Sequence, residues 1–484
     1  MYWRSIKSTM AWTKVSTMAS AAVGLLLTGI GHAQTDPYDA LARDIFKELI
    51  EINTTDSVGN VTTASEAMAQ RLRAAGFAAG DIQILGPNDR KKNLVVRLRG
   101  SGKHKPVLLI GHLDVVEARR EDWTTDPFKF VEKDGYFFGR GTQDMKNGDA
   151  IMVAALIRLK KEGFRPSRDI ILALTADEET GSSNGVDWLL KNHRDLVDAQ
   201  FVLNHDGNAI TSEHGKPLYF EMDGTEKVYG DFLLTATNPG GHSSLPVPDN
   251  AIYSIAAALE RVAHYDFPFE LNNVTRGYYE RMATIETGQR AADIKAILAT
   301  PPDKQAIERL SHDAIDHSIM RTTCVATRLE GGHANNALPQ RARATVNCRI
   351  LPGHSPEEVR HTLTDVVADP AIKVQYIDFE GEVRDTAPDY RGYPPPPLLP
   401  EVMKPLDKLV AQMWPGLKVV PAMSAGASDG YYTSAAGLPT YVVGAIAIDK
   451  DNIRAHGRDE NVGVESFYRG NEFFYRYLKA ITSH

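Results

Sequence analysis

A chain of 484 residues is longer than one ordinary hydrophobic core requires, so we expect two domains. Apolar residues make up 43% of the chain and charged residues 24%, as in a globular protein. The formal net charge is −8 at pH 7 and no basic block occurs, which argues against a nucleic-acid-binding protein.

The first 33 residues have the pattern of a secretory signal peptide. Basic residues at positions 4, 7 and 14 precede an apolar run over 19–30, and small residues at positions 31 and 33 suit cleavage before Gln34. A membrane anchor is the alternative, but about a dozen apolar residues are too few to span a bilayer. We therefore predict an exported protein, periplasmic or secreted, with no membrane segment after cleavage. Removing three basic residues leaves 51 against 62 acidic ones, a net charge of −11.

The chain has two cysteines, Cys324 and Cys348, which are too few and too far apart for a cysteine-ligated zinc site. They lie twelve residues on either side of Asn336, so in a simple hairpin they would face each other. An exported protein could oxidise them to a disulfide. We favour two buried free thiols over this alternative.

Helices and unbroken apolar strands alternate in the first part of the mature chain. Helices are expected at 39–52, 64–75 and 149–162, and strands at 94–98, 107–110, 170–175 and 201–204. Unbroken apolar runs suit strands that are buried on both faces. The alternation predicts a three-layer α/β domain with a mainly parallel sheet, in which ligands collect at the carboxyl ends of the strands.

The pattern changes near Gly224. The next elements are expected to be strands at 228–237, 322–329, 344–350 and 372–377, with helices at 251–262 and 356–367. They predict a small α+β domain with a sheet that helices cover on one face. A polar, helix-prone insertion at 267–318 interrupts this domain, and the sequence does not indicate its role.

Residues 385–400 form a proline-rich, extended connector. After it, a helix at 401–413, a strand at 441–443 and a helix at 465–478 resume the α/β pattern. The second domain is therefore expected to be inserted into the first. We predict a signal peptide at 1–33, a catalytic domain at 34–224 and 383–484, and an inserted domain at 225–382.

Three polar clusters follow apolar runs between Leu108 and Glu179. They are His112-Leu113-Asp114, Gly139-Arg140-Gly141 followed by Asp144, and Asp177-Glu178-Glu179. Carboxylates and imidazoles at neighbouring strand ends can collect divalent metal ions. Asp206 after the strand at 201–204 and His456 further along add ligands of the same kind.

Each cluster by itself has a plainer explanation. His112 and Asp114 could be a solvated strand end, although a nearby carboxylate can also fix the tautomer of a histidine. Asp144 could cap the helix that follows it. The three carboxylates at 177–179 repel one another, so a cation or a proton is expected to neutralise part of their charge. The order of the whole set along one predicted sheet favours a metal centre.

Four motifs occur in a fixed order along the chain. They are Gly111-His112-Leu113-Asp114-Val115-Val116, Gly139-Arg140-Gly141-Thr142-Gln143-Asp144-Met145-Lys146, Asp177-Glu178-Glu179-Thr180-Gly181 and Gly240-Gly241-His242-Ser243-Ser244. From about residue 40 to the C-terminus, the chain resembles the dinuclear zinc peptidase and deacylase family. That family includes carboxypeptidase S, glutamate carboxypeptidase, aminoacylase, acetylornithine deacetylase and succinyl-diaminopimelate desuccinylase.

The resemblance implies a site for two zinc ions, for which cobalt or manganese could substitute. Asp144 would bridge the two ions. Glu179 and His456 would complete one ion's ligands, and His112 and Asp206 the other's.

The resemblance also implies the catalytic roles. Asp114 would orient His112, and Glu178 would stand beside the bridging water as general base. Two cations about 3.5–4 Å apart would lower the pKa of that water and polarise the scissile carbonyl. Glu178 would pass the proton to the leaving amine. A cis peptide is implied at Asp144-Met145.

In this resemblance, residues 225–382 form a lid and dimerisation domain with a ferredoxin-like sheet. His242 would donate to the oxyanion in the opposite subunit of a homodimer, although an exposed histidine in a glycine-rich turn is the alternative. Asn336 and Arg349 fall at substrate-binding positions of the lid. The forked side chain of Arg349 suits a carboxylate, and a surface arginine on a strand is its alternative.

One position departs from the family pattern. Tyr431, in Ala427-Ser428-Asp429-Gly430-Tyr431-Tyr432, stands where carboxypeptidase members carry an arginine. This change puts a strict requirement for a free C-terminal carboxylate in doubt. The insertion at 267–318 is similar to the longer lids of the carboxypeptidase S branch.

We predict a zinc-dependent exopeptidase of carboxypeptidase or dipeptidase type, which hydrolyses the amide bond of small peptides. A deacylase acting on an N-acyl amino acid is the first alternative. A non-catalytic member that binds a metal or a peptide is the second. Such a protein would be expected to lack the base or a ligand, whereas all six positions are present here.

Overall fold

The computed structural model describes residues 36–181, 183–207, 209–378, 381–389, 391 and 393–483. The signal peptide predicted for residues 1–33 lies outside these residues. In the described part of the chain, no helix is both long enough and apolar enough to cross a membrane.

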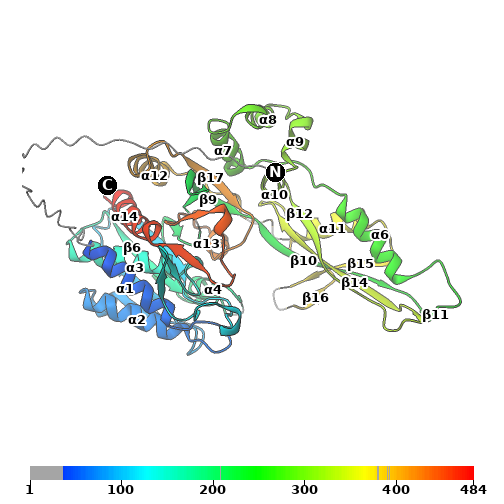
Figure 1. Ribbon diagram of the computed structural model, residues 1–484, viewed down its shortest axis with the longest axis horizontal. Helices are drawn as coiled ribbons and strands as arrows, with labels where there is room; N and C mark the ends of the chain where they lie inside the picture. Colours follow the sequence, from blue (N-terminus) through cyan, green and yellow to red (C-terminus); the bar gives the residue numbers. More distant parts are fainter. Residues whose placement is uncertain are drawn as a thin grey trace, which may run out of the picture. The chain divides into compact units, whose positions relative to one another are not determined.

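A ten-stranded sheet with the order β1-β2-β6-β3-β7-β18-β9-β8-β19, in which β17 also pairs with β9, forms the centre of the catalytic part (Figure 1). Its strands are β1 Ile82–Leu85, β2 Asn93–Leu98, β3 His104–His112, β6 Arg168–Thr175, β7 Phe201–Asn204, β8 Ile210–Glu213, β9 Lys216–Glu226, β17 Val419–Ser424, β18 Thr440–Val442 and β19 Ala447–Asp449. The four central strands β6, β3, β7 and β18 are parallel, as their unbroken apolar runs predict.

The sheet is mixed, so the prediction of a mainly parallel sheet needs correction. β2 runs antiparallel to both β1 and β6, and β9 runs antiparallel to both β18 and β8. Short connections join β1 to β2 and β8 to β9, and such connections suit antiparallel neighbours. Of these flanking strands, β1 and β8 have only four residues each and β9 is half-buried, which weakens their sequence signal.

Helices cover both faces of this sheet and confirm the predicted three-layer α/β arrangement. Leu109 and Leu172 pack into a core with one set of helices: α1 Pro37–Glu51, α2 Val61–Ala74, α3 Lys146–Lys161, α12 Pro400–Met413 and α14 Val464–Ile481. The alternate residues Leu108 and Ile171 pack on the other face with α4 Gly185–Asn192. Successive side chains of a strand point to opposite faces, so both faces are apolar and buried.

The inserted domain contains an antiparallel five-stranded sheet with the order β12-β14-β10-β15-β16. Its strands are β10 Val228–Thr237, β12 Thr323–Gly331, β14 Arg341–Ile350, β15 Ile372–Ile377 and β16 Val383–Arg384. Helices α6 Ala251–Ala263 and α11 Pro356–Val367 pack on one face, and the buried positions of β14 alternate with less buried ones. The prediction of an α+β domain covered on one face is confirmed.

The two sheets meet at Lys227, the residue between β9 and β10. The predicted change at Gly224 therefore falls inside β9, three residues before the chain leaves the large sheet. Because β9 continues directly into β10, this short link connects the catalytic part to the inserted domain.

Cys324 and Cys348 form a disulfide, so the prediction of two free thiols is wrong. The two residues are register partners on β12 and β14, with their Cα atoms 4.1 Å apart. This register is the one that the alternative of a simple hairpin around Asn336 implied. Once the two strands pair, the cysteines lie directly opposite each other.

The insertion at 267–318 folds into four helices, which are α7 Asn273–Met282, α8 Gly288–Leu298, α9 Lys304–Leu310 and α10 Ala314–Ile319. Its apolar side chains, including Tyr278 and Met282, share a core with Val420 and Ala422 of β17. The insertion therefore packs on the catalytic sheet, although its sequence lies between elements of the inserted domain (Figure 1).

Candidate metal centre and active-site cavity

Three parallel strands bring candidate ligands to one edge of the large sheet. β3 ends at His112, β6 is followed by residues 177–179, and β7 is followed by Asp206. Because β3 runs parallel to both β6 and β7, their carboxyl ends meet at the same edge. Asp144 reaches this edge from the start of α3, because it directly precedes Met145, the N-cap of that helix.

The side chain of Asp144 lies between two imidazoles. Its Oδ1 is 3.0 Å from Nε2 of His112, and its Oδ2 is 3.0 Å from Nε2 of His456. The same nitrogen of His456 is 3.0 Å from Oε1 of Glu179. A carboxylate that offers one oxygen to each side has the arrangement of a bridging ligand.

The donor set fits divalent metal ions. His112, Asp144 and Glu179 each offer a ligand atom within 4.8 Å of the others. Imidazole nitrogens and carboxylate oxygens are ligands that zinc accepts. Asp206 lines the same cavity, where burial, followed by the charge of Asp144, raises its pKa to about 7. A bound cation would compensate this buried negative charge.

Glu460 and Gln143 hold the Asp144 loop in place. Oε1 of Glu460 accepts hydrogen bonds from the backbone N–H groups of Gln143, at 2.6 Å, and Asp144, at 3.1 Å. The Gln143 side chain accepts from the backbone N–H of Ala455 and donates to the carbonyl of Asn461. Two segments more than 300 residues apart are thereby joined beside His456. The peptide bond Asp144-Met145 is cis, as the resemblance implied.

Asp114 lies beneath the loop that carries the proposed base. Its carboxylate accepts from the backbone N–H groups of Glu178, at 3.2 Å, and Glu179, at 3.1 Å. Nδ1 of His112 is 3.0 Å from the backbone carbonyl of Asp114 and 3.7 Å from its Oδ1. The closest polar contact of Nδ1 is therefore this backbone carbonyl, while the Asp114 side chain holds the backbone of the two glutamates.

The three adjacent carboxylates have different environments. Asp177 is buried and forms an ion pair with Lys91 at 2.7 Å, so a lysine compensates the first charge. Burial raises the pKa of Glu178 to about 10, partly offset by His112, with Asp206 and Asp429 raising it further. Glu178 and Glu179 line the cavity beside Asp144 and Asp206.

Arg349, for which the resemblance implied a substrate-binding role, lies in the wall of this cavity. Its guanidinium lies over the ring of Tyr229, 4.9 Å from the ring centroid. His242 and Asn336 are not among the described residues that line the cavity. His242 is exposed on β11 Gly241–His242, which pairs with β13 Ala337–Leu338, and the carbonyl of Asn336 accepts from the backbone N–H of Ser243.

The structure adds Asp429 to the site, which the sequence did not single out. Its carboxylate is buried and accepts from Nδ2 of Asn184 at 2.6 Å and from Oγ1 of Thr175 at 3.1 Å. Burial raises its pKa to about 6. Asp429 precedes α13 Gly430–Ala435, and its position in the motif before Tyr431 was the available signal.

Comparison with known proteins finds relatives along most of the chain. The chain is 26% identical over 386 residues to the N-fatty-acyl-amino acid synthase/hydrolase PM20D1 of Xenopus tropicalis, covering 77% of this chain and 72% of that protein. It is 27% identical over 401 residues to the probable carboxypeptidase S-like 2 of Dictyostelium discoideum, covering 78% of this chain and 71% of that protein.

A similar fold occurs in the M20 family metallo-carboxypeptidase Sso-CP2 from Sulfolobus solfataricus. The TM-score is 0.65 at 17% sequence identity, over 91% of this chain and 99% of that one. Residues 108–480 match the model of peptidase family M20/M25/M40. The chain, whose candidate ligand side chains converge at Asp144, belongs to this family of metal-dependent hydrolases that act on amide bonds.

Proposed function

We propose that the protein is an exported, zinc-dependent exopeptidase that hydrolyses the amide bond of small peptides. The observation that carries this proposal is the Asp144 carboxylate between His112 and His456, in the same cavity as Glu178. Arg349 in the cavity wall suits a carboxylate of the substrate.

Two zinc ions would share Asp144. Glu179 and His456 would complete the ligands of one ion, and His112 and Asp206 those of the other. Cobalt or manganese could replace zinc, because both accept the same nitrogen and oxygen ligands. Bound ions would polarise the scissile carbonyl and lower the pKa of the attacking water.

Glu178 is the proposed proton carrier. It would take a proton from the attacking water and give it to the leaving amine nitrogen. Glu178 lines the same cavity as Asp144 and Asp206, where the attacking water would be held. Asp114 supports this role because its carboxylate accepts hydrogen bonds from the backbone N–H groups of Glu178 and Glu179 and so holds this loop in place.

Two variants test these assignments separately. Glu178→Gln should retain bound zinc and lose peptide hydrolysis by about a hundredfold or more, because it removes the base and not a ligand. Asp144→Ala should lose zinc together with activity. Metal analysis of both purified proteins alongside a peptide assay distinguishes them. Full activity in Glu178→Gln would overturn the assignment of the base.

Hydrolysis of N-acyl amino acids is the second candidate function. It is supported by the similarity to the N-fatty-acyl-amino acid synthase/hydrolase PM20D1 and by Tyr431 at the position of the carboxypeptidase arginine. A panel of dipeptides and N-acyl amino acids compared by kcat/KM separates the two. Equal cleavage of peptides with a blocked C-terminus would support the loss of a carboxylate requirement.

We further propose a homodimer in which His242 serves the neighbouring subunit. His242 is exposed on the inserted domain and absent from the described lining of its own cavity. Strand β12 is an edge strand with exposed Val325 and Leu329. Such an edge suits pairing with a second copy.

The proposed export rests on the sequence pattern of residues 1–33. The disulfide between Cys324 and Cys348 supports it, because disulfides persist in oxidising compartments. Expression of the full chain followed by N-terminal sequencing of the exported form should give Gln34 as the first residue.

A further inference from the structure

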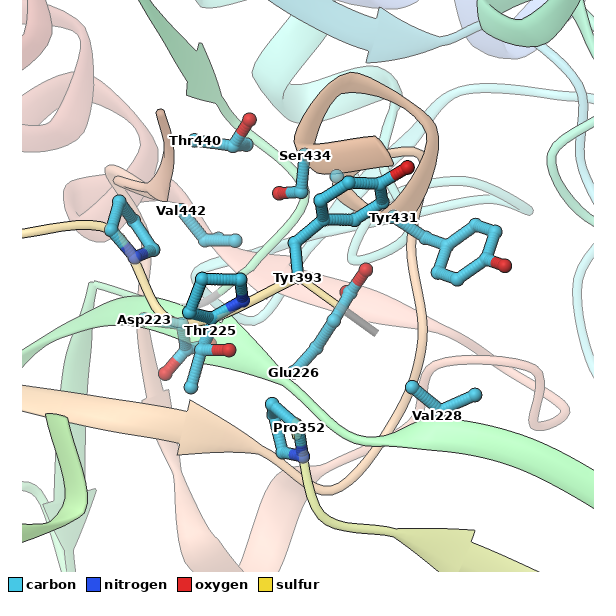
Figure 2. A pocket seen from close by; sticks show the side chains of 13 residues that line it. Asp223, Thr225, Glu226, Val228, Pro352, Tyr393, Tyr431, Ser434, Thr440 and Val442 are labelled. Atoms are coloured by element: carbon cyan, nitrogen blue, oxygen red, sulfur yellow. The ribbon is translucent and has the colours of Figure 1, made fainter. Parts of the chain in front are cut away.

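A side pocket adjoins the active-site cavity between β9 and α13 (Figure 2). Asp223, Glu226 and Tyr431 belong to the walls of both spaces. Tyr393 of the proline-rich connector closes another side. The cavity volume of this pocket is about 40 Å³. At 10–15 Å³ each, this is room for about three groups of the size of a water molecule.

In this pocket, Asp223 and Glu226 each have one carboxyl oxygen without a hydrogen-bond partner. Oδ1 of Asp223 and Oε1 of Glu226 are buried and have no hydrogen-bond partner in the described structure. The other oxygen of Glu226 accepts from Oγ of Ser428 at 2.9 Å. None of the described residues that line the pocket is a lysine, an arginine or a histidine. A buried acceptor without a donor is costly, so this arrangement suits a ligand that brings donors.

The raised pKa values of Asp223 and Glu226 also suit a ligand that brings hydrogen-bond donors and a positive charge. Burial raises the pKa of Glu226 to about 8. Burial also raises the pKa of Asp223 well above its usual value, and the charges of Glu221 and Glu226 raise it further. A cation entering the pocket would stabilise the ionised carboxylates.

Two aromatic rings complete the site. Figure 2 shows the carboxyl end of Glu226 pointing toward the side of the pocket where Tyr393 and Tyr431 lie. Aromatic faces and carboxylates together attract an ammonium or guanidinium group. The small volume suits the end of such a side chain.

We propose that this side pocket binds the positively charged end of the substrate, an ammonium or guanidinium group, while the scissile amide lies at the metal centre. This inference rests on the proposed function and deepens it. It assigns Asp223 and Glu226 to substrate selection and names peptides or N-acyl amino acids with a basic residue as the substrate class.

Matched peptides that differ in one charge test the proposal on the metal-loaded mature protein. Gly-Lys is compared with Gly-Nε-acetyl-Lys, and Lys-Gly with Nε-acetyl-Lys-Gly, by kcat/KM and by calorimetric Kd. We expect the charged member of at least one pair to be favoured about tenfold, as a charge-assisted hydrogen bond allows. Gly-Leu with and without an N-acetyl group shows whether an α-amino group is the source of the charge. Equal values within every pair would overturn the proposal.

Variants locate the preference in the pocket. Glu226→Gln and Asp223→Asn keep the shape of the side chain and remove its charge, so the ratio of charged to neutral substrate should fall toward one in each. Glu213→Gln, an exposed carboxylate at the end of β8, is the matched control and should keep the wild-type ratio. If the ratio of charged to neutral substrate stayed unchanged in both pocket variants, the preference would arise elsewhere and the proposal would be overturned.

The two readouts separate this inference from the proposed function. If none of the peptides and N-acyl amino acids is hydrolysed but charged peptides still bind about tenfold more tightly, the proposed function fails and the pocket assignment stands. If peptides are hydrolysed without any effect of charge, the proposed function stands and the pocket assignment fails.

Discussion

At the scale of single residues, the candidate metal centre depends on how firmly Asp144 is held. Its side chain meets two imidazoles, and its backbone N–H donates to Glu460. Glu460 is completely buried and forms an ion pair with Arg140, which is also buried. Each member of this pair lies four residues from a candidate ligand, Arg140 from Asp144 and Glu460 from His456, so the pair shapes the loops that present them.

Replacing Glu460 should therefore destabilise the fold and disturb the site together. Glu460→Gln retains an acceptor for the Asp144 loop but leaves the buried Arg140 without a counter-charge, which typically costs about 3–5 kcal/mol. Urea unfolding measures the loss. Glu66→Gln, at an exposed position of α2, is the control and should change stability by less than about 0.5 kcal/mol. Equal stability of the two variants would show that the Arg140 pair is not a main support.

At the scale of elements, the inserted domain is built around β14. This strand pairs with β10 on one side and β12 on the other, and every second residue points into the core beneath α6 and α11. The disulfide joins β12 to β14 near one end of their ladder. Only one register pair, Thr323 with Arg349, lies between the disulfide and that end.

Loss of this disulfide should destabilise the inserted domain. The bond closes a loop with a sequence separation of 24, for which a loss of about 3 kcal/mol is expected. Urea unfolding of the mature protein with and without a reductant measures this difference. The double variant Cys324→Ser, Cys348→Ser should match the reduced protein and show no response to reductant. If reductant left the unfolding free energy of the wild-type protein unchanged, the expected stabilisation by the disulfide would be contradicted.

At the scale of the whole molecule, the cavity of one chain contains Arg349 from the inserted domain but not His242 among its described lining. Within a homodimer, a second copy could supply this histidine. The exposed edge of β12 and the exposed Ile252 and Tyr253 of α6 offer an apolar surface for such an assembly.

Mixing two inactive variants tests this arrangement. Glu178→Gln and His242→Ala should each be nearly inactive as homodimers. After subunit exchange at equal concentrations, one site of each mixed dimer regains both residues, so about a quarter of wild-type activity should return. Absence of recovery, with exchange verified by native mass spectrometry, would place the action of His242 within its own chain or outside catalysis.

Local sequence patterns were sufficient for most of the element assignments. The alternating strand at Val228–Thr237 and the capped helix at Pro356–Val367 were predicted with their observed bounds, because periodicity and capping are local signals. The apolar runs of β6 and β7 predicted buried strands in the same way. Strands such as β8 and β17 were missed, since short or flanking strands carry little pattern of their own.

For the site, the sequence by itself supplied the ligand types and their order at the strand ends, because a strand's end and its next residues are neighbours along the chain. Only the tertiary structure decided the contacts that depend on distant segments. These contacts are the ion pair of Lys91 with Asp177, the support of Asp144 by Glu460, and the packing of the 267–318 insertion on β17. Each joins residues whose proximity depends on the complete sheet order, which no local pattern specifies.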